Sequence, residues 1–254
     1  MRPTLERAAR LWARVPLPRE PAVAVLGYHR VDDDGSPLAV GTRAFADHMA
    51  VLAAEREQRP MLDLDDALAR LAAGTAPRRA AVVTFDDAWA DNHANALAHL
   101  VEGRVPATLF VPSRLIGLPG RLTRGQLEEF AAAGIAIGAH SRTHAHLPAC
   151  DDAELEREVR GSRDDLEDLL GVPCTRFAYP AGLMDGRVRA AVAAAGFRSA
   201  VTTVRGWARA GVDPLAVPRN VVGDFGAATF AAALRGGLNY LRPVEAARAR
   251  LGAR

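Results

Sequence analysis

The chain alternates between two patterns of hydrophobic residues. Short, almost wholly apolar runs are typical of strands buried on both faces of a sheet, and longer stretches with an apolar residue every three or four positions are typical of helices with one buried face. The short runs predict strands over residues 22–28, 81–85, 107–111, 135–139, 176–179, 199–203 and 216–222. The longer stretches predict helices over residues 45–55, 64–73, 90–101, 123–133, 151–170 and 187–195.

This alternation of strands and helices predicts the fold class. It is typical of an α/β protein with a parallel sheet covered by helices. Seven strands in 254 residues favour a distorted (β/α) barrel with about seven parallel strands, and a doubly wound open sheet is the alternative. We expect a catalytic domain over residues 21–240, a basic amphipathic segment over residues 1–20 and a basic helix over residues 241–254.

Composition and charge narrow the function classes. The net charge of +2 comes from an excess of arginine at the two ends of the chain, not from a basic stripe, so we expect no nucleic-acid partner. The two cysteines, Cys150 and Cys174, lack the spacing of a zinc site, which favours a reducing compartment. No run approaches the roughly 18 apolar residues of a membrane span, and the start of the chain lacks the apolar core of a signal peptide. We therefore expect a cytoplasmic protein.

Residues 4–15 have the pattern of a short amphipathic helix. Over residues 4–15, Leu5, Ala8, Ala9 and Trp12 share one helical face. Such a helix more often packs on its own domain, but it could also lie on a membrane surface. Peripheral contact with the inner face of a membrane is therefore a further expectation, and the oligomeric state stays open.

Polar residues that can serve in catalysis or metal binding stand at the carboxyl ends of the predicted strands. His29, Asp86, Asp87, His140 and Tyr179 each end or directly follow one of these runs. In parallel α/β folds the functional face lies beyond the carboxyl ends of the strands, so we expect these side chains to lie near one another.

The first pair of residues, Asp86 and Asp87, can divide two tasks. One carboxylate can bind a metal ion while the other accepts a proton from water. Taken alone, an aspartate at this place is more easily explained as a helix N-cap.

His140 and His144 are four positions apart, which would place both imidazoles on one face of a helical turn and let them bind one metal ion. His146 competes for the second position, and ordinary surface or core histidines are the alternative, but three histidines within seven residues after a buried strand favour a metal site. With Asp87, the two histidines make a ligand set that leaves coordination positions open; it suits zinc, and other first-row divalent ions as well.

The segment Tyr179, Pro180, Ala181 and Gly182 predicts a tight turn at a strand end. Such a turn can direct a backbone N–H into a site, as an oxyanion donor requires. Taken alone, it is an ordinary turn.

These segments together resemble the polysaccharide deacetylases, carbohydrate esterase family four, with the NodB homology domain. The family motif T-F-D-D-G is matched by residues 84–87, with Ala88 in place of the glycine. The motif H-S-x-x-H is matched by His140, Ser141 and His144, and F-x-Y-P-x-G by residues 177–182. The resemblance covers about residues 22–222, and the early Tyr28-His29 pair is similar to the subgroup related to poly-N-acetylglucosamine deacetylases.

The resemblance implies a NodB-like barrel and a role for each motif. It implies Asp86 as general base, Asp87, His140 and His144 as metal ligands, and the backbone N–H of Ala181 as an oxyanion donor. The residues expected to bind the substrate or its oxyanion are Tyr179, Pro180, Ala181 and Gly182. The metal would acidify a water and polarise the acetamide carbonyl.

Two departures from the family pattern leave roles to be filled. The arginine that orients the base in many members is replaced by Ala178, and Arg219 is our candidate substitute. The late Leu-x-His motif that supplies the general acid is absent, since no histidine follows His146. His29 is the candidate to approach the site, as acid or substrate contact, unless it only completes a strand-end hydrogen-bond network.

The function expected from these residues is removal of N-acetyl groups from N-acetylhexosamine units of a glycan, oligosaccharide or glycolipid precursor. Two alternatives stay open: a catalytically weak carbohydrate-binding protein on the same fold, and an amidohydrolase of a small non-sugar amide.

Overall fold

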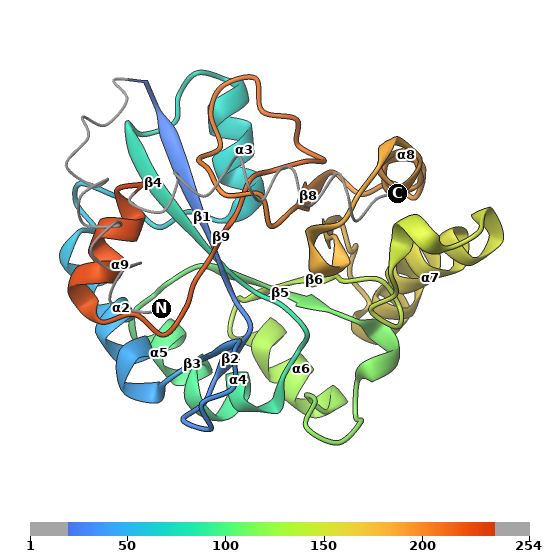
Figure 1. The fold of residues 1–254 in the computed structure, drawn as a ribbon, viewed down its shortest axis with the longest axis horizontal. Helices are drawn as coiled ribbons and strands as arrows, with labels where there is room; N and C mark the ends of the chain where they lie inside the picture. The colour runs from blue at the N-terminus through green and yellow to red at the C-terminus, as the bar shows by residue number, and fades with distance from the viewer. Residues whose placement is uncertain (1–19, 237–254) are drawn as a thin grey trace.

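The computed structural model describes residues 20–236, whose centre is a curled sheet with helices along its outer side (Figure 1). The strands of this sheet are β1 (Ala22–Tyr28), β4 (Arg79–Phe85), β5 (Ala107–Val111), β6 (Ala136–Ala139), β7 (Arg176–Ala178), β8 (Ser199–Val201) and β9 (Asn220–Val221). They pair in the order β8-β7-β6-β5-β4-β1-β9, and every pair is parallel. The expected seven-stranded parallel sheet is confirmed, and it curls towards a barrel.

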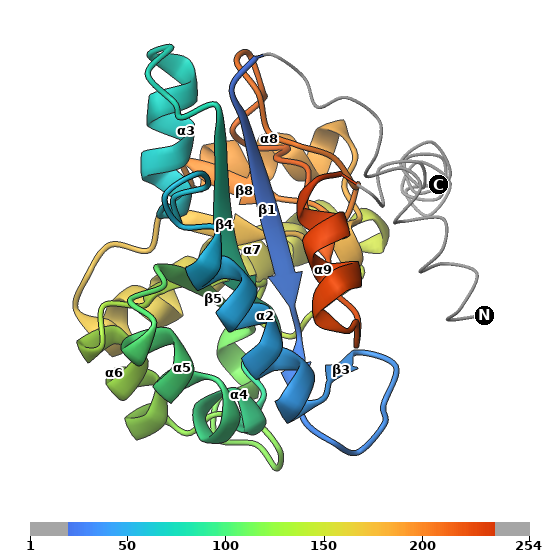
Figure 2. The same cartoon turned by 90° about the vertical axis from the view of Figure 1, so that its left-hand side faces the viewer.

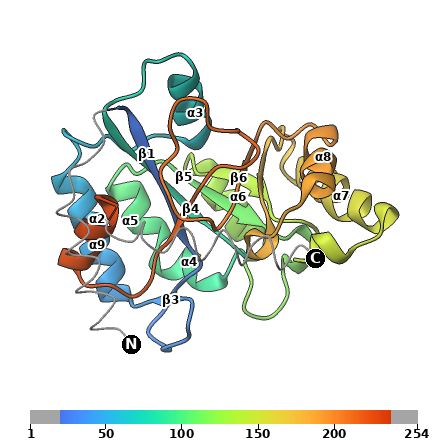
Figure 3. The ribbon, with the colours of Figure 1, turned by 45° about the horizontal axis from the view of Figure 1, so that its top comes forward.

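The helices follow the strands as the pattern predicted. They are α2 (Thr42–Ala54), α3 (Leu64–Ala72), α4 (Ala90–Asn95), α5 (Leu97–Glu102), α6 (Arg124–Ala132), α7 (Asp152–Leu170), α8 (Gly186–Ala194) and α9 (Ala227–Leu234). Asp63, Thr123 and Asp151 cap the amino ends of α3, α6 and α7 by accepting backbone N–H groups. Helices α2 and α9 lie side by side along β1 (Figure 2), and α7 and α8 pair at the other end of the sheet (Figure 3).

Some expectations need correction. The single helix predicted over residues 90–101 is two short helices, because Ala96 has φ −116° and interrupts the helical backbone between them. The short strands β2 (Arg30–Val31) and β3 (Ala39–Val40) were not predicted, since two-residue strands leave no pattern in a sequence. Helix α9, of eight residues, was not predicted either.

The two terminal segments expected to be basic lie outside the described residues, apart from Glu20. Within residues 20–236, no helix is long and apolar enough to cross a membrane.

Strand residues alternate between two apolar cores. Tyr28 and Phe85 point outward and pack with Phe45 of α2, whereas Val25 and Val82 point into the barrel. Helix α3 packs against this inner core and lies at the end of β1 opposite its arrowhead (Figure 2). The carboxyl ends of the strands lie at the other end, where the candidate site lies.

The predicted last strand, 216–222, is the segment that closes the barrel. Val217 pairs with Val201 of β8, but Asn220 and Val221 pair with β1 on the opposite edge of the sheet. Pro218 stands at the crossing, where a residue without an N–H removes no strand hydrogen bond. The regular strand is therefore only two residues long, and the crossing places Arg219 between the two edges.

A buried histidine connects the outer elements on this side. The His48 ring Nε2 lies 2.7 Å from the Phe225 carbonyl oxygen, and its Nδ1 lies 3.2 Å from the Tyr28 hydroxyl. Since a carbonyl can only accept, Nε2 carries the hydrogen and Nδ1 accepts from the hydroxyl. The ring stacks on Phe230 of α9 at 4.0 Å. Burial lowers the pKa of His48 to about 4, although the Phe225 carbonyl opposes this shift.

The low pKa of His48 predicts acid sensitivity of the fold. In the unfolded chain a histidine with a pKa near 6.5 takes up a proton as the pH falls, and folded His48 does not until about pH 4. Stability is therefore lost on going from pH 7 to 5, by about 2 kcal/mol from this residue. Urea unfolding at both pH values should show a drop that His48→Gln reduces and His146→Gln, at an exposed histidine, does not. An equal drop in wild type and His48→Gln would contradict this account.

Candidate active site

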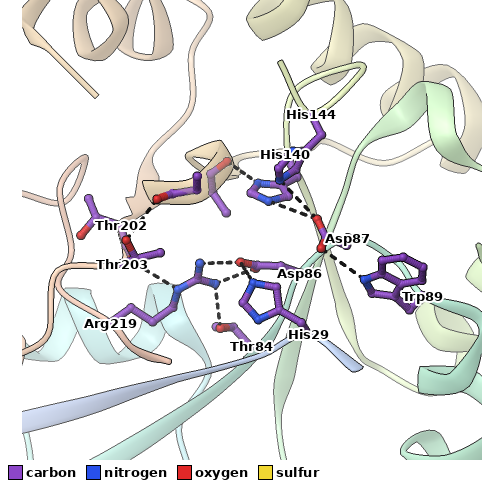
Figure 4. A network of polar contacts seen from close by, with 12 residues as sticks. His29, Thr84, Asp86, Asp87, Trp89, His140, His144, Thr202, Thr203 and Arg219 are labelled. Atoms are coloured by element: carbon purple, nitrogen blue, oxygen red, sulfur yellow. Dashed lines mark hydrogen bonds and ion pairs between the residues drawn. The ribbon is translucent and has the colours of Figure 1, made fainter. Parts of the chain in front are cut away.

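The candidate site lies at the carboxyl end of the barrel. The alternation that points Val25 and Val82 inward also points His29, Thr84 and Asp86 inward, because side chains two apart share a face. Asp87 would then point outward. Its φ of +71° breaks the alternation, and its carboxylate shares the mouth of the barrel with Asp86 (Figure 4).

Three side chains form a cluster suited to a metal ion. Oδ1 of Asp87 lies 3.6 Å from Nε2 of His140 and 3.4 Å from Nε2 of His144. One ligand atom from each residue lies within 4.8 Å of the others. His146 is exposed and is not part of this cluster, so the geometry selects His144 as the second histidine.

The protonation of His140 fits a metal ligand. Its Nδ1 lies 2.7 Å from the Ala178 carbonyl oxygen, so Nδ1 carries the hydrogen and the lone pair of Nε2 faces Asp87. Burial lowers the pKa of His140, although the negative charges of Asp86 and Asp87 oppose this shift. The lowered pKa favours the neutral ring that metal coordination requires. Two nitrogens and one carboxylate oxygen match zinc or another first-row divalent ion with open positions.

The two histidines do not converge by sharing a helical turn, as the spacing predicted. Residues 140–146 are not helical, and the chain bends at Ser141 and His144, with φ values of +57° and +62°. The carboxylate of Glu158 on α7 holds this bend, accepting from the backbone N–H groups of Arg142 and Thr143 at 2.9 Å each. In the sequence, Glu158 is one charge among many on a long helix, so nothing there predicted its burial.

Asp86 forms a closed ion pair with Arg219. The two guanidinium nitrogens lie 2.6 and 2.5 Å from its two carboxylate oxygens, and Arg219 also donates to Thr84 Oγ1 and the Thr202 carbonyl. Asp86 is 2% exposed and Arg219 is fully buried. A side chain on Gly27 would come within 3.1 Å of the Arg219 side chain, so glycine in this central strand makes room for the arginine.

The surroundings of Asp86 favour its charged form. Burial alone would raise the pKa of the carboxyl group, but the charge of Arg219 and its hydrogen bonds hold the pKa well below its usual range. The structure therefore places Arg219 beside Asp86, the position for which it was the candidate substitute in the sequence.

His29 is the other group beside Asp86. Its Nε2 lies 3.8 Å from Oδ2 of Asp86, and its Nδ1 is buried without a hydrogen-bond partner among residues 20–236. The strand-end hydrogen bond in this place uses the His29 backbone carbonyl, which accepts from Asn92. The imidazole itself is thus not held by a strand-end network.

The turn after β7 contributes backbone rather than side chains. Tyr179 is fully buried and its hydroxyl donates to the Leu215 carbonyl at 2.8 Å, so its side chain has no surface to offer a substrate, against the expectation. Pro180, Ala181 and Gly182 form a tight turn that is kinked at Ala181, where φ is +54°. Pro180 has no N–H and the Gly182 N–H donates to the Tyr179 carbonyl at 2.7 Å, so Ala181 carries the one N–H of the three that this bond leaves. Gly182, with φ +72°, packs so closely on Thr203 that a Cβ would lie 2.1 Å from Thr203 Oγ1.

Comparison with known proteins agrees with this geometry. The sequence model of the polysaccharide deacetylase family matches residues 73–200. The Bacillus subtilis protein YxkH, provisionally described as a polysaccharide deacetylase, is 27% identical over 196 residues, which are 77% of this chain and 68% of that protein. A chitooligosaccharide deacetylase of Rhizobium leguminosarum bv. trifolii is 30% identical over 137 residues, 52% of this chain and 61% of that protein.

The fold also matches a solved structure. The Streptococcus pyogenes deacetylase PplD in complex with acetate superposes with a TM-score of 0.78 at 21% identity, covering 85% of this chain and 99% of PplD. This likeness confirms the NodB-like barrel expected from the sequence.

Proposed function

Since the chain belongs to the polysaccharide deacetylase family, we propose that it is a metal-dependent N-deacetylase acting on N-acetylhexosamine units of a glycan, oligosaccharide or glycolipid precursor. One observation carries the proposal: the Asp87, His140 and His144 cluster lies beside a carboxylate, Asp86, that a buried arginine keeps charged. The cytoplasmic, membrane-peripheral location stays a prediction.

The cluster would hold a divalent ion, for which zinc is our first choice. When bound, the ion would supply Lewis acidity to the acetamide carbonyl and to a water molecule. His140 would bind the ion through Nε2, which carries no hydrogen, and Asp87 would contribute the anionic ligand.

Asp86 is proposed as the general base. It takes a proton from the attacking water, whose oxygen adds to the carbonyl carbon. Arg219 fixes both oxygens of Asp86 and so sets the direction in which the carboxylate accepts. The backbone N–H of Ala181 is proposed to donate to the oxyanion of the tetrahedral intermediate.

His29 is proposed as the general acid. The C–N bond breaks as the amine nitrogen gains a proton, giving acetate and the free amino sugar. His29 Nε2 lies close to Asp86, so a proton taken from water is near the group that must deliver one.

Acetate release tests the proposal. Protein loaded with Zn²⁺ should release acetate from N-acetylated chitooligosaccharides, lose this activity with a chelator and regain it with added metal. His144→Ala should lower zinc affinity and activity at least about a hundredfold, as loss of a ligand does, whereas His146→Ala, two residues away, should not.

Two outcomes would favour the alternatives instead. Glycan binding without turnover, unchanged by Asp86→Asn, would indicate a carbohydrate-binding protein. Hydrolysis of a small amide, with no acetate from any N-acetylhexosamine, would indicate an amidohydrolase with a different substrate.

A further inference from the structure

We propose that Trp89 and Arg121 are positioning residues that hold Asp87 in its metal-binding conformation. The inference rests on the proposed function, because it takes Asp87 as a metal ligand. Neither residue belongs to the motifs that identify the site, and Arg121 stands 34 positions after Asp87 in the chain.

Trp89 fixes the carboxylate of Asp87. Its indole Nε1–H donates to Oδ2 at 3.2 Å, and the other oxygen, Oδ1, is the one that faces His140 and His144. Figure 4 shows Trp89 on the side of Asp87 away from the two histidines. With Oδ2 engaged by the indole, the carboxylate presents Oδ1 to the metal position, as hydrogen-bonded carboxylate ligands do.

Arg121 fixes the backbone of the same residue. Its Nη1 donates to the Asp87 carbonyl oxygen at 2.7 Å, and its guanidinium lies 3.6 Å from the centroid of the Trp89 ring. One side chain therefore holds the Asp87 carbonyl and covers the indole that holds the Asp87 carboxylate.

The backbone at Asp87 needs such support. Asp87 and Ala88 both have left-handed φ values, +71° and +52°, a conformation that aspartate adopts more readily than alanine but that L residues seldom adopt at two successive positions. The segment before α6 adds two backbone hydrogen bonds to this turn, from Leu122 N–H to the Ala88 carbonyl and from Ala90 N–H to the Gly120 carbonyl. Together with the Arg121 side chain, these bonds hold the turn at residues 87–90 against residues 120–122.

The role of Trp89 depends on the indole N–H as well as on ring stacking. Arg30 also lies over the ring, at 5.0 Å, and is fixed by Asp91 at 2.8 Å. Phenylalanine would keep both cation contacts and lose only the donor, so it separates the two contributions.

Calorimetric titration of metal-free protein with Zn²⁺ tests the inference. Trp89→Phe and Arg121→Ala should each weaken zinc binding roughly ten- to a hundredfold, the usual effect of removing a group that orients a ligand. Arg121→Lys, which keeps one charged donor, should recover part of the loss. Arg124→Ala is the matched control, because Arg124 lies three residues away and pairs with Glu128 on the surface.

A positioning role has two further signatures. The metal-free variants should unfold at the same urea concentration as wild type within about 0.5 M, and saturating Zn²⁺ should restore most of the kcat of Trp89→Phe with an unchanged KM. If Trp89→Phe binds Zn²⁺ as tightly as wild type, the inference is wrong. If wild type binds no Zn²⁺, or His144→Ala binds it equally well, the proposed metal site itself is wrong.

Discussion

Asp86→Asn is expected to lower kcat for acetate release by roughly a hundred- to ten-thousand-fold, the usual contribution of a general base. Asparagine has the same shape but cannot take the proton of the attacking water. The three proposed metal ligands are untouched, so zinc affinity should stay within about threefold of wild type. The measurement is acetate release together with zinc content for both proteins.

Retained zinc binding is the control in this experiment, because it shows that the variant is folded around the site. The control matters, since Asp86→Asn leaves the buried Arg219 without its counter-charge. A variant that binds zinc and keeps more than a tenth of wild-type kcat would exclude Asp86 as the base.

The same assay tests the proposed acid. His29→Gln should lower kcat for acetate release and leave zinc affinity within about threefold of wild type, because His29 is not among the proposed metal ligands. An unchanged kcat in His29→Gln would assign the protonation of the amine to another group.

Local rules predicted a large part of the site. Strand alternation places His29 and Asp86 on the inner face, and short-range spacing brings His140 and His144 to one place, although by a bend and not by a helix. These relations depend on residues close in sequence or on the common edge of a parallel sheet, which hydrophobic patterns report.

The supporting residues could not be predicted in the same way. Glu158 and Arg121 act across 16 and 34 positions of chain, whereas Trp89 lies two positions from Asp87. Each of the three resembles an ordinary helix or loop residue in the sequence. Arg219 was predicted only because Ala178 stands where many family members have an arginine, which left that role to another residue. The structure explains its position: segment 216–222 crosses between the two edges of the sheet instead of forming one regular strand.

Arg219→Leu is expected to destabilise metal-free protein by about 3–5 kcal/mol, because it leaves the Asp86 carboxylate buried without its partner. Domains are typically stable by only about 5–15 kcal/mol, so this loss should be plain in urea unfolding at pH 7 and in a low yield of folded protein. Activity of the folded fraction should also fall, since within residues 20–236 only Arg219 donates to both oxygens of Asp86.

The double variant Asp86→Asn, Arg219→Leu separates a charge effect from a packing effect. If the unpaired carboxylate causes the loss, neutralising it should make the double variant more stable than Arg219→Leu alone, although it carries one substitution more. If the lost volume of the arginine causes it, the double variant should be no more stable than the single one. The ion pair then would stabilise the barrel by filling the space over Gly27, and its charge would matter only for directing the base.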